Sequence, residues 1–290
     1  MKVVKNPFLN QFVVYVPHRQ NRPEERLNGE LICPFCRGNE HLCDEEILRL
    51  PEKGEWQVRV VKNKFPIIMP HEVIIHTPEH KKFFIDIPFE NARLVFKAYK
   101  IRFNFHRKKS KGKVLIYANE GEEAGASLFH SHSQLVVLDG SFKPSFPAPQ
   151  PVENLVEENE YFWVYCPAFS QWPYEFWIRP KRKGFFGEIK SEELINLVFL
   201  LRKYLKQLKE LHRKIHKFKI PFSYNWYIYP ETPWYLRVIP RFVYHAGLEL
   251  ASNVVANIVS PLEASLALKG LEKDYAKVLE KLKEFEEKDS

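Results

Sequence analysis

Hydrophobic and polar residues alternate along several short stretches of the chain, and two longer stretches repeat their apolar residues every three or four positions. Alternation is typical of half-buried β-strands, and the longer period is typical of amphipathic helices. The pattern predicts helices at Glu90–Arg107 and Ser191–His216. It predicts strands at Phe12–Val16, Trp56–Lys62, Val73–His76, Lys113–Ala118, His132–Leu138, Tyr174–Ile178, Phe222–Tyr229 and Tyr235–Ile239.

Each predicted helix carries an apolar stripe that should face the core. The first stripe consists of Leu94, Ala98, Ile101 and Phe105, and the second consists of Leu194, Leu197, Leu201, Leu205, Leu208, Leu211 and Ile215. Farther on, Ser260-Pro261-Leu262-Glu263 combines an N-cap serine with proline at the first helical position, and it predicts the start of a charged C-terminal helix.

The order strand–helix–strand–strand occurs twice along the chain, which indicates an internal duplication. We therefore expect an α+β fold, with a mainly antiparallel sheet and helices packed on one side. The Pro-rich stretch Ser141–Pro151 would join an N-terminal half, residues 1–140, to a C-terminal half, residues 141–290.

Composition narrows the class of protein. The 290 residues are 45% hydrophobic, which suffices for one large core or two modest ones. We see no apolar N-terminal signal region and no apolar run long enough to span a bilayer, so we expect a cytoplasmic protein without a membrane partner. The net charge of +8 is compatible with nucleic-acid binding. However, the basic residues are dispersed and the aromatic residues lie inside predicted strands, so a zinc-stabilised nucleic-acid-binding protein is the less favoured interpretation.

Cys33-Pro34-Phe35-Cys36 forms a Cys-x-x-Cys motif, which in a cytoplasmic protein indicates zinc binding or redox chemistry. No βαβ pattern surrounds the motif and a Gly-Asn turn follows it, so zinc is favoured over a thioredoxin-like pair. Structural zinc takes four ligands in a tetrahedron, so two histidines must come from elsewhere. Cys43 could compete as a ligand but is expected to be a spare buried thiol, and Cys166 is expected in the core.

The segment His130-Ser131-His132-Ser133-Gln134 predicts an active-site strand. Alternate residues of a strand share a face, so its two histidines and its glutamine should point to one side. Imidazoles and a carboxamide there suit a metal ligand, a nucleophile and an oxyanion donor. The Gly-rich stretch 121–127 before it would let the backbone approach a ligand closely. The alternative is a solvated polar strand with chance histidines, and the other histidines, including His71, His106 and His212, are expected to be surface groups.

These motifs and several others occur in an order that resembles the galactose-1-phosphate uridylyltransferase family, a duplicated branch of the histidine-triad superfamily. The resemblance extends from about Asn6 to Glu249. Its segments are Val16–Pro23, Cys33–Cys36, Asn63–Pro66, Thr77–His80, Asn119–Gly121, Gly125–Ser127, His130–Gln134, Trp172–Glu175 and Gly247–Glu249.

The resemblance implies a half-barrel of the histidine-triad type and a role for each matched residue. It implies one structural zinc ion per chain, held by Cys33, Cys36, His80 and His130. It makes His132 the nucleophile that forms a nucleotidyl-histidine, with ping-pong kinetics, and makes Gln134 a donor to the phosphate oxygen. The substrate-binding residues that it implies are Arg19 and Arg22 for phosphate, Asn63 for ribose, Asn119 and Ser127 near Gln134, and Glu249 for a sugar hydroxyl. In the family Glu249 is donated by the partner subunit, which implies a homodimer.

Three departures bear on the substrate. Lys64 stands where the family commonly has Asp, and Leu248 replaces an aromatic residue. Tyr235 and Arg237 occupy positions where some members have histidines, so we expect no second metal. The favoured interpretation is transfer of UMP from UDP-glucose to galactose 1-phosphate or another hexose 1-phosphate, with UDP-hexose preferred by a modest margin. The alternative is an ADP-glucose phosphorylase that transfers an adenylyl group.

Overall fold

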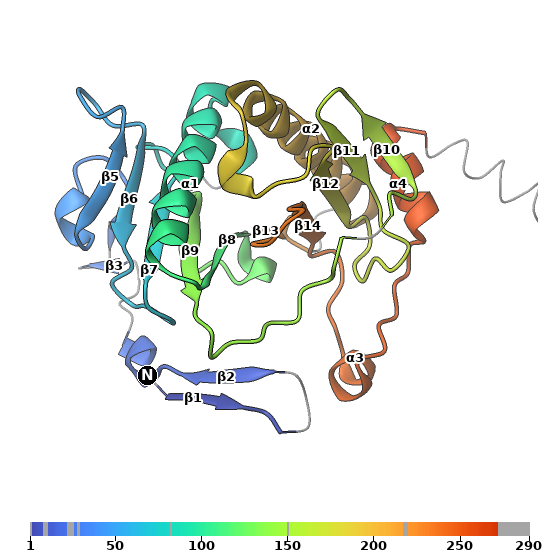
Figure 1. The fold of residues 1–290 in the computed structure, drawn as a ribbon, viewed down its shortest axis with the longest axis horizontal. Helices are drawn as coiled ribbons and strands as arrows, with labels where there is room; N and C mark the ends of the chain where they lie inside the picture. Colours follow the sequence, from blue (N-terminus) through green and yellow to red (C-terminus); the bar gives the residue numbers. More distant parts are fainter. Residues whose placement is uncertain are drawn as a thin grey trace, which may run out of the picture.

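A single antiparallel sheet organises the chain (Figure 1). The structure, a computed structural model, describes residues 2–7, 11–21, 26–27, 30–81, 83–149, 151–216 and 220–271. Within these ranges ten strands form the sheet, in the spatial order β10 (Leu155–Glu158), β11 (Phe162–Tyr165), β12 (Phe176–Pro180), β14 (Leu236–Pro240), β13 (Tyr224–Ile228), β8 (Lys113–Glu120), β9 (His132–Leu138), β7 (His71–Ile75), β6 (Val58–Lys62) and β5 (Glu46–Leu50).

The two halves of this sheet have the same strand order. From the edges to the centre, one half runs β5-β6-β7-β9-β8 and the other runs β10-β11-β12-β14-β13. A long helix follows the third strand of each half, α1 (Phe89–Lys109) in the first and α2 (Ser191–His216) in the second. The predicted duplicated α+β fold is therefore confirmed. Strands β8 and β13 pair at the centre, with Asn119 opposite Asn225, so one sheet spans both halves and the boundary at residue 140 stays a prediction.

The main core lies between the sheet and the two long helices, which lie side by side across one face (Figure 1). Phe84, Phe96 and Trp226 are completely buried there. The rings of Phe96 and Trp226 stack with their centroids 6.0 Å apart. Because aromatic side chains bury large apolar areas, this layer supplies much of the hydrophobic stabilisation.

The other face of the sheet is covered by short elements and by the Pro-rich connection. A hairpin of β1 (Lys2–Lys5) and β2 (Phe12–Tyr15) packs Phe12 near Phe142, which lies in the connection after β9. In the second half the Tyr235 hydroxyl donates to the carbonyl oxygen of Pro147 at 2.6 Å. The remaining elements are β3 (Arg26–Leu27), β4 (Glu30–Leu31), α3 (Gly247–Ser252), α4 (Pro261–Lys269) and 3₁₀ turns at Pro17–Asn21, Glu40–Leu42, Phe84–Asp86, Glu122–Ala124 and Phe186–Glu188.

Helix α1 buries only part of the predicted stripe, since Ala98 is buried and Leu94 packs against the core. Ile101 and Phe105 are each 37% exposed, whereas Arg102 and His106 are buried. Both of these polar side chains bond to the buried carboxylate of Glu72, at 2.5 and 2.7 Å. The core therefore contains an ion network, and hydrophobic periodicity alone assigns its members to the surface.

Other predictions about the elements had mixed outcomes. On α2 the predicted leucines are buried, but Ile215 is 47% exposed. Ser260 caps α4, since its Oγ accepts from the backbone N–H of Glu263 at 3.2 Å. His212 is buried, so the expectation that it lies on the surface was wrong. Strands β1, β3, β4, β5 and β10 were not predicted. Among the residues described, no helix has the length and apolarity needed to cross a bilayer.

Candidate active site

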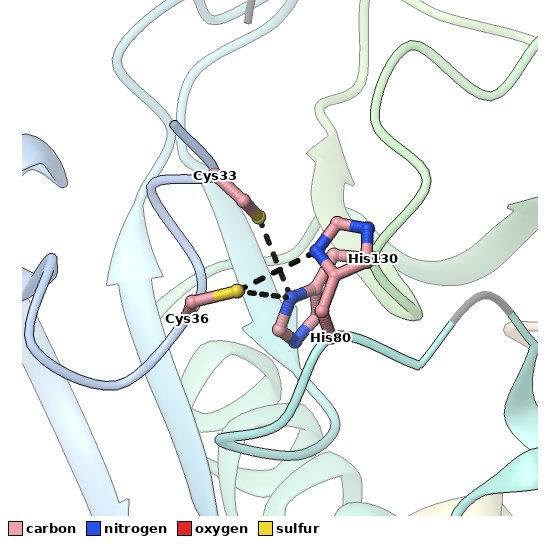
Figure 2. Close-up of side chains that lie close together, drawn as sticks. All are labelled: Cys33, Cys36, His80 and His130. Carbon is pink, nitrogen blue, oxygen red and sulfur yellow. Dashed lines mark hydrogen bonds between the residues drawn. The ribbon is translucent and has the colours of Figure 1, made fainter. Parts of the chain in front are cut away.

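The predicted zinc ligands converge at one place beside β9. One ligand atom each from Cys33, Cys36, His80 and His130 lies within 4.8 Å of all the others. Figure 2 shows the two thiols of the Cys-x-x-Cys turn facing the two imidazole rings. The Cys33 Sγ lies 3.4 Å from His130 Nδ1, and the Cys36 Sγ lies 3.5 Å from His80 Nδ1. Segments more than 40 residues apart in the sequence thus form one cluster.

The geometry of this cluster fits a tetrahedral zinc ion. Zinc–sulfur bonds of ~2.3 Å and zinc–nitrogen bonds of ~2.05 Å at the tetrahedral angle place sulfur and nitrogen about 3.5 Å apart. The Cys36 Sγ to His130 Nδ1 distance of 3.6 Å agrees with this value, as do the two distances above. Cys43 lies outside the cluster, since its thiol donates to the Pro34 carbonyl oxygen at 3.1 Å.

Protonation in the cluster also suits a metal. Burial lowers the pKa of His130 to about 4, so its ring is neutral at pH 7. Its Nε2–H donates to the Thr77 carbonyl oxygen at 2.9 Å, which leaves the Nδ1 lone pair for coordination. Burial raises the pKa of the Cys33 thiol to about 12, so a bound zinc ion would displace a proton from it.

His132 begins β9, two residues after the cluster, and is 8% exposed. Its Nδ1–H donates to the backbone carbonyl oxygen of His130 at 2.8 Å. This tautomer gives Nε2 the lone pair, which is the electron pair that a nucleophile needs. Phe35, from the Cys-x-x-Cys turn, packs against the ring with centroids 5.1 Å apart. The turn that carries the two cysteines therefore packs directly against the candidate nucleophile.

Gln134 follows His132 on the same face of β9. Its Oε1 lies 2.8 Å from His71 Nε2 and accepts from the Tyr117 hydroxyl at 3.2 Å. Both bonds engage the carboxamide oxygen, so the amide nitrogen is the end that can donate to a ligand. This is the orientation required of an oxyanion donor.

Two cavities meet at His132 and Gln134. The smaller, of about 120 Å³, is polar, and its lining residues are Arg19, Ile67, Tyr117, Asn119, Gly125, Ala126, Ser127, His132 and Gln134. The larger, of about 350 Å³, is mostly apolar. It shares Ser127, His132 and Gln134 with the first and adds Ile32, Pro34, Phe35, Leu42, Cys43, Asp44, Val61, Lys62, Asn63, Lys64, Phe65, Val73 and Leu128.

The structure brings most of the predicted substrate-binding residues to these cavities. Arg19 donates to the Phe65 carbonyl oxygen at 2.5 Å and lines the smaller cavity. Asn119, Ser127 and Asn63 lie at one cavity or the other. The predicted phosphate ligand Arg22 lies outside the described residues.

Glu249 lies away from the cavities of its own chain. It is on α3, where its Oε2 accepts from the backbone N–H of Ala246 at 2.9 Å. Figure 1 shows α3 at the end of a segment that extends from the body of the sheet. A role for Glu249 at a substrate would therefore need a second copy of the chain.

The Gly-rich stretch before β9 has two different reasons for its glycines. Gly125 has a φ of 75° and lines the smaller cavity. Gly121 has a φ of 89°, and a Cβ there would lie 2.3 Å from Ser223 Oγ. Gly121 thus permits close packing between the halves of the protein, and of these two glycines only Gly125 lines the cavity.

Sequence reasoning missed His71, Tyr117 and Phe35 as parts of the site. His71 is 2% exposed, so the expectation that it lies on the surface was wrong. Tyr117 alternates with Asn119 along β8, and this alternation was the available signal for its facing the cavity. Only the strand register could reveal His71, because its partner Gln134 lies 63 residues away.

Tyr235 and Arg237 stand where some members of the family have histidines, and Arg237 forms a buried ion pair with Glu175. Arg237 Nη2 donates to Glu175 Oε2 at 2.9 Å, and both side chains are buried. The carboxylate raises the pKa of Arg237 further above its ordinary value against the opposing effect of burial. Tyr235 stacks on Trp177 beside the pair, with centroids 4.0 Å apart.

Comparison with known sequences gives matches over nearly the whole chain. Residues 15–140 match a family described as "Domain of unknown function (DUF4931) N-terminal domain". An ADP-glucose phosphorylase of Arabidopsis thaliana is 25% identical, over 91% of this chain and 91% of that protein. A galactose-1-phosphate uridylyltransferase of Thermotoga maritima is 23% identical, over 94% of this chain and 99% of that protein.

Solved structures show the same fold. The crystal structure of an ADP-glucose phosphorylase from Arabidopsis thaliana with bound ADP-glucose has a TM-score of 0.71, with 24% identity, 92% of this chain and 98% of that chain covered. A structure of uridylyltransferase has a TM-score of 0.72, with 21% identity, 94% of this chain and 99% of that chain covered. The architecture of the ten-stranded sheet is therefore shared across both kinds of protein.

Proposed function

We propose that this chain, which is similar to galactose-1-phosphate uridylyltransferases and to an ADP-glucose phosphorylase, is a nucleotidyltransferase of that family and transfers a nucleotidyl group from a nucleoside diphosphate hexose to a phosphate acceptor. The observation that carries the proposal is the position of His132. Its tautomer makes Nε2 the nucleophilic nitrogen, and the residue lines both cavities where they meet.

The proposed reaction has two steps at one nitrogen. In the first, His132 Nε2 attacks the α-phosphorus, an N–P bond forms, and the bond from phosphorus to the bridging oxygen breaks, releasing hexose 1-phosphate. In the second, a phosphate oxygen of the acceptor attacks the same phosphorus and the imidazole leaves. Splitting the transfer in this way replaces one difficult displacement with two easier ones.

Neighbouring side chains supply charge stabilisation in this scheme. The amide nitrogen of Gln134 donates to a nonbridging oxygen as negative charge develops, and Arg19 pairs with phosphate on the side of the smaller cavity. The backbone carbonyl of His130, which accepts from Nδ1–H, stabilises the imidazole as it gains positive character. Phosphoryl transfer depends mainly on such positioning and electrostatics.

The two cavities suggest how the donor lies. The larger, mostly apolar cavity suits a nucleobase and ribose, with Asn63 at the ribose, and the smaller polar cavity suits the phosphates and the sugar. The α-phosphorus would then lie at their junction, beside His132.

The base of the donor is the open part of the proposal. The adenylyl alternative is at least as well supported as the uridylyl interpretation, because the ADP-glucose phosphorylase of Arabidopsis thaliana matches with 25% identity. Lys64 also weakens the uridylyl interpretation, because it lines the larger cavity at a position where uridylyltransferases of the family commonly have Asp. We therefore propose ADP-hexose with inorganic phosphate as the reaction to test first, and UDP-hexose with hexose 1-phosphate as the second.

Zinc and a homodimer complete the proposal. One zinc ion at Cys33, Cys36, His80 and His130 would hold the start of β9 in place, remote from the transferred group. A second copy would cover the exposed apolar side chains around α3, among them Leu250 and Ile258, which are 78% and 74% exposed. It would also bring Glu249 to a sugar hydroxyl of its partner.

The test is covalent labelling. The purified protein is incubated separately with ADP-glucose and UDP-glucose, each radiolabelled in the α-phosphate, and the denatured protein is examined for an acid-labile adduct. A label on His132 supports nucleotidyl transfer. If neither donor labels protein that contains its metal, the proposal is overturned.

A further inference from the structure

His71 occupies an unusual place for a buried histidine. It begins β7, two residues before Val73, which pairs with Gln134 on β9. The side chain is 2% exposed and touches the carboxamide that would meet the transferred phosphate. None of the proposed chemical steps uses this imidazole.

The hydrogen bonds of His71 define its tautomer. The backbone N–H of Ile67 donates to Nδ1 at 3.1 Å, so Nδ1 is an acceptor and Nε2 carries the hydrogen. The acceptor for that hydrogen is Gln134 Oε1, at 2.8 Å. Asn63 also approaches Nε2, at 3.1 Å, but with its amide nitrogen, which is itself a donor and cannot accept.

This bond decides which end of the Gln134 carboxamide faces the cavity. A glutamine amide can rotate by half a turn at little steric cost, and only its partners distinguish oxygen from nitrogen. Here a ring N–H fixes the oxygen, and the Tyr117 hydroxyl donates to the same atom at 3.2 Å. The amide nitrogen is thereby directed to the ligand.

The second half of the protein contains a matching arrangement. Gln134 pairs with Val73 and Tyr117 on its neighbouring strands, and Arg237 pairs with Trp177 and Tyr227 on the corresponding strands. Arg237 is thus the counterpart of Gln134 in the duplicated fold.

The partners of these counterparts also correspond. Glu175 lies two residues before Trp177, as His71 lies two residues before Val73. Glu175 accepts from Arg237 at 2.9 Å, and the Tyr227 hydroxyl lies 3.5 Å from Arg237 Nη1. In each half, a residue at the start of the third strand (His71) or just before it (Glu175) bonds to the side chain on the last strand.

We propose that His71 is a positioning residue for the nucleotidyl transfer, holding the Gln134 carboxamide with its nitrogen towards the phosphate. The inference rests on the proposed function for the identity of the reaction, and on the geometry alone for the orientation of the amide. His71 acts through Gln134, so its contribution to the rate should exist only while Gln134 is present.

A double-mutant cycle tests this dependence. The rate of adduct formation is measured in a single turnover for wild type, His71→Leu, Gln134→Ala and the double variant. We expect Gln134→Ala to slow the reaction by roughly 10²–10³-fold, the usual cost of one oxyanion donor. We expect His71→Leu to slow it by about 10–100-fold in the presence of Gln134, and by less than about 2-fold in the Gln134→Ala protein. Equal slowing in both backgrounds would overturn the inference.

Three further variants separate positioning from folding. His71→Gln retains an N–H that can reach Gln134 Oε1 and should recover most of the rate. His71→Phe keeps a ring of similar shape without nitrogen and should slow the reaction as much as His71→Leu. It replaces the leucine variant in the test if that variant folds poorly. His212→Leu removes a buried imidazole from α2, where it packs against Phe222 and Phe242, and should leave the rate unchanged. A slow His71→Gln protein or a fast His71→Phe protein would contradict the proposal.

A neutron crystal structure of His71→Phe distinguishes the nitrogen of the Gln134 amide from its oxygen, and it gives a readout that does not depend on the substrate. We expect the Gln134 carboxamide to turn its nitrogen away from the cavity or to leave its position beside Tyr117. A carboxamide that keeps both its position and its orientation would overturn the inference, whatever reaction the protein catalyses. If wild type forms no adduct with either donor, the proposed function fails, and the crystal structure still decides the role of His71.

Discussion

The Nδ1 nitrogen of His132 lies 2.8 Å from the carbonyl oxygen of His130, so a candidate zinc ligand also sets the tautomer of the candidate nucleophile. The side chain of His130 points to the cysteines, while its backbone carbonyl oxygen accepts from the imidazole of His132, two residues later. A shift of His130 would therefore disturb the direction of the His132 ring. The cysteine–histidine cluster and the reacting nitrogen are therefore coupled through His130, in addition to the packing of Phe35 on the His132 ring.

The first prediction concerns zinc. Elemental analysis should find about one zinc ion per chain, because the cluster supplies a single tetrahedral set. Cys33→Ser should lose the metal and lower the melting temperature markedly, because metal binding contributes directly to folding. Cys43→Ser is the matched control and should keep the zinc. A metal-free native protein, or zinc lost equally from both variants, would contradict the assignment.

The second prediction concerns the nucleophile. His132→Asn should form no nucleotidyl adduct and should not exchange label between a nucleotide sugar and its sugar 1-phosphate. His132→Gly leaves space for the missing ring, so it should regain turnover with a nucleotide imidazolide as donor. Mass spectrometry of the denatured proteins provides the measurement. An acid-labile adduct on His132→Asn would show that another group attacks.

The third prediction concerns the donor. The second-order rate constants for adduct formation with ADP-glucose and UDP-glucose, measured under one set of conditions, give the preference directly. We expect ADP-glucose to react at least as fast as UDP-glucose. Lys64→Asp introduces the residue common in uridylyltransferases and should move the ratio towards UDP-glucose. An unchanged ratio would place base selection elsewhere in the larger cavity, and faster reaction of UDP-glucose with wild type would restore the uridylyl interpretation.

The fourth prediction concerns the dimer. His132→Asn chains lack the nucleophile but still carry Glu249. Glu249→Ala chains keep the nucleophile but lack the carboxylate. If Glu249 serves the site of its partner, a mixed dimer contains one site with both groups. Mixing the two impaired variants under exchange conditions should therefore recover activity towards about a quarter to a half of wild type, as dimer statistics allow. No recovery in a mixture shown to contain mixed dimers would exclude a shared site.

The fifth prediction concerns pH. Burial raises the pKa of Glu120 from 4.5 to about 8, and the carboxyl group bonds to Ser131 Oγ and to the backbone N–H of Phe84. The folded protein therefore keeps this proton while the unfolded chain loses it, so the contribution of Glu120 to stability is full below pH 4.5 and falls as the pH rises towards 8. The whole effect is about 5 kcal/mol.

Glu120→Gln tests the assignment because it keeps the bonds and removes the titration. Urea unfolding at pH 5, 6.5 and 8 should show the variant gaining stability relative to wild type as the pH rises. Glu122→Gln, an exposed change in the adjacent turn, should follow wild type at every pH. Parallel behaviour of Glu120→Gln and wild type would mean that Glu120 is ionised in the fold.

The sequence predicted the elements that follow hydrophobic periodicity and missed those that depend on long-range polar pairs. The leucine stripe of α2 was recognised because its core contacts are apolar. The stripe of α1 was misassigned in its C-terminal part, at Ile101 and Phe105, because Arg102 and His106 enter the core there to meet Glu72, some 30 residues earlier in the chain. No local pattern marks such a pair.

The candidate site shows the same division. Cys33, Cys36 and His130 belong to short motifs with characteristic spacing, so they were found, and the structure brings them together. His71 belongs to no such motif, and its role follows from the pairing of Val73 with Gln134. A shift of one residue in that register would have turned His71 away from Gln134.

The second half of the duplicated sheet has no counterpart of the His132 imidazole, so we expect each chain to bind one nucleotidyl group covalently. Tyr235 lies two residues before Arg237, the position that His132 holds before Gln134, and its phenol is fully buried with its hydroxyl bonded to Pro147. Burial raises the pKa of Tyr235, so no phenolate forms near neutral pH to act as a second attacking group. At saturating donor without acceptor, the mass of each chain should therefore increase by one nucleotidyl unit and stop there, so a titration to this end point counts active sites per chain.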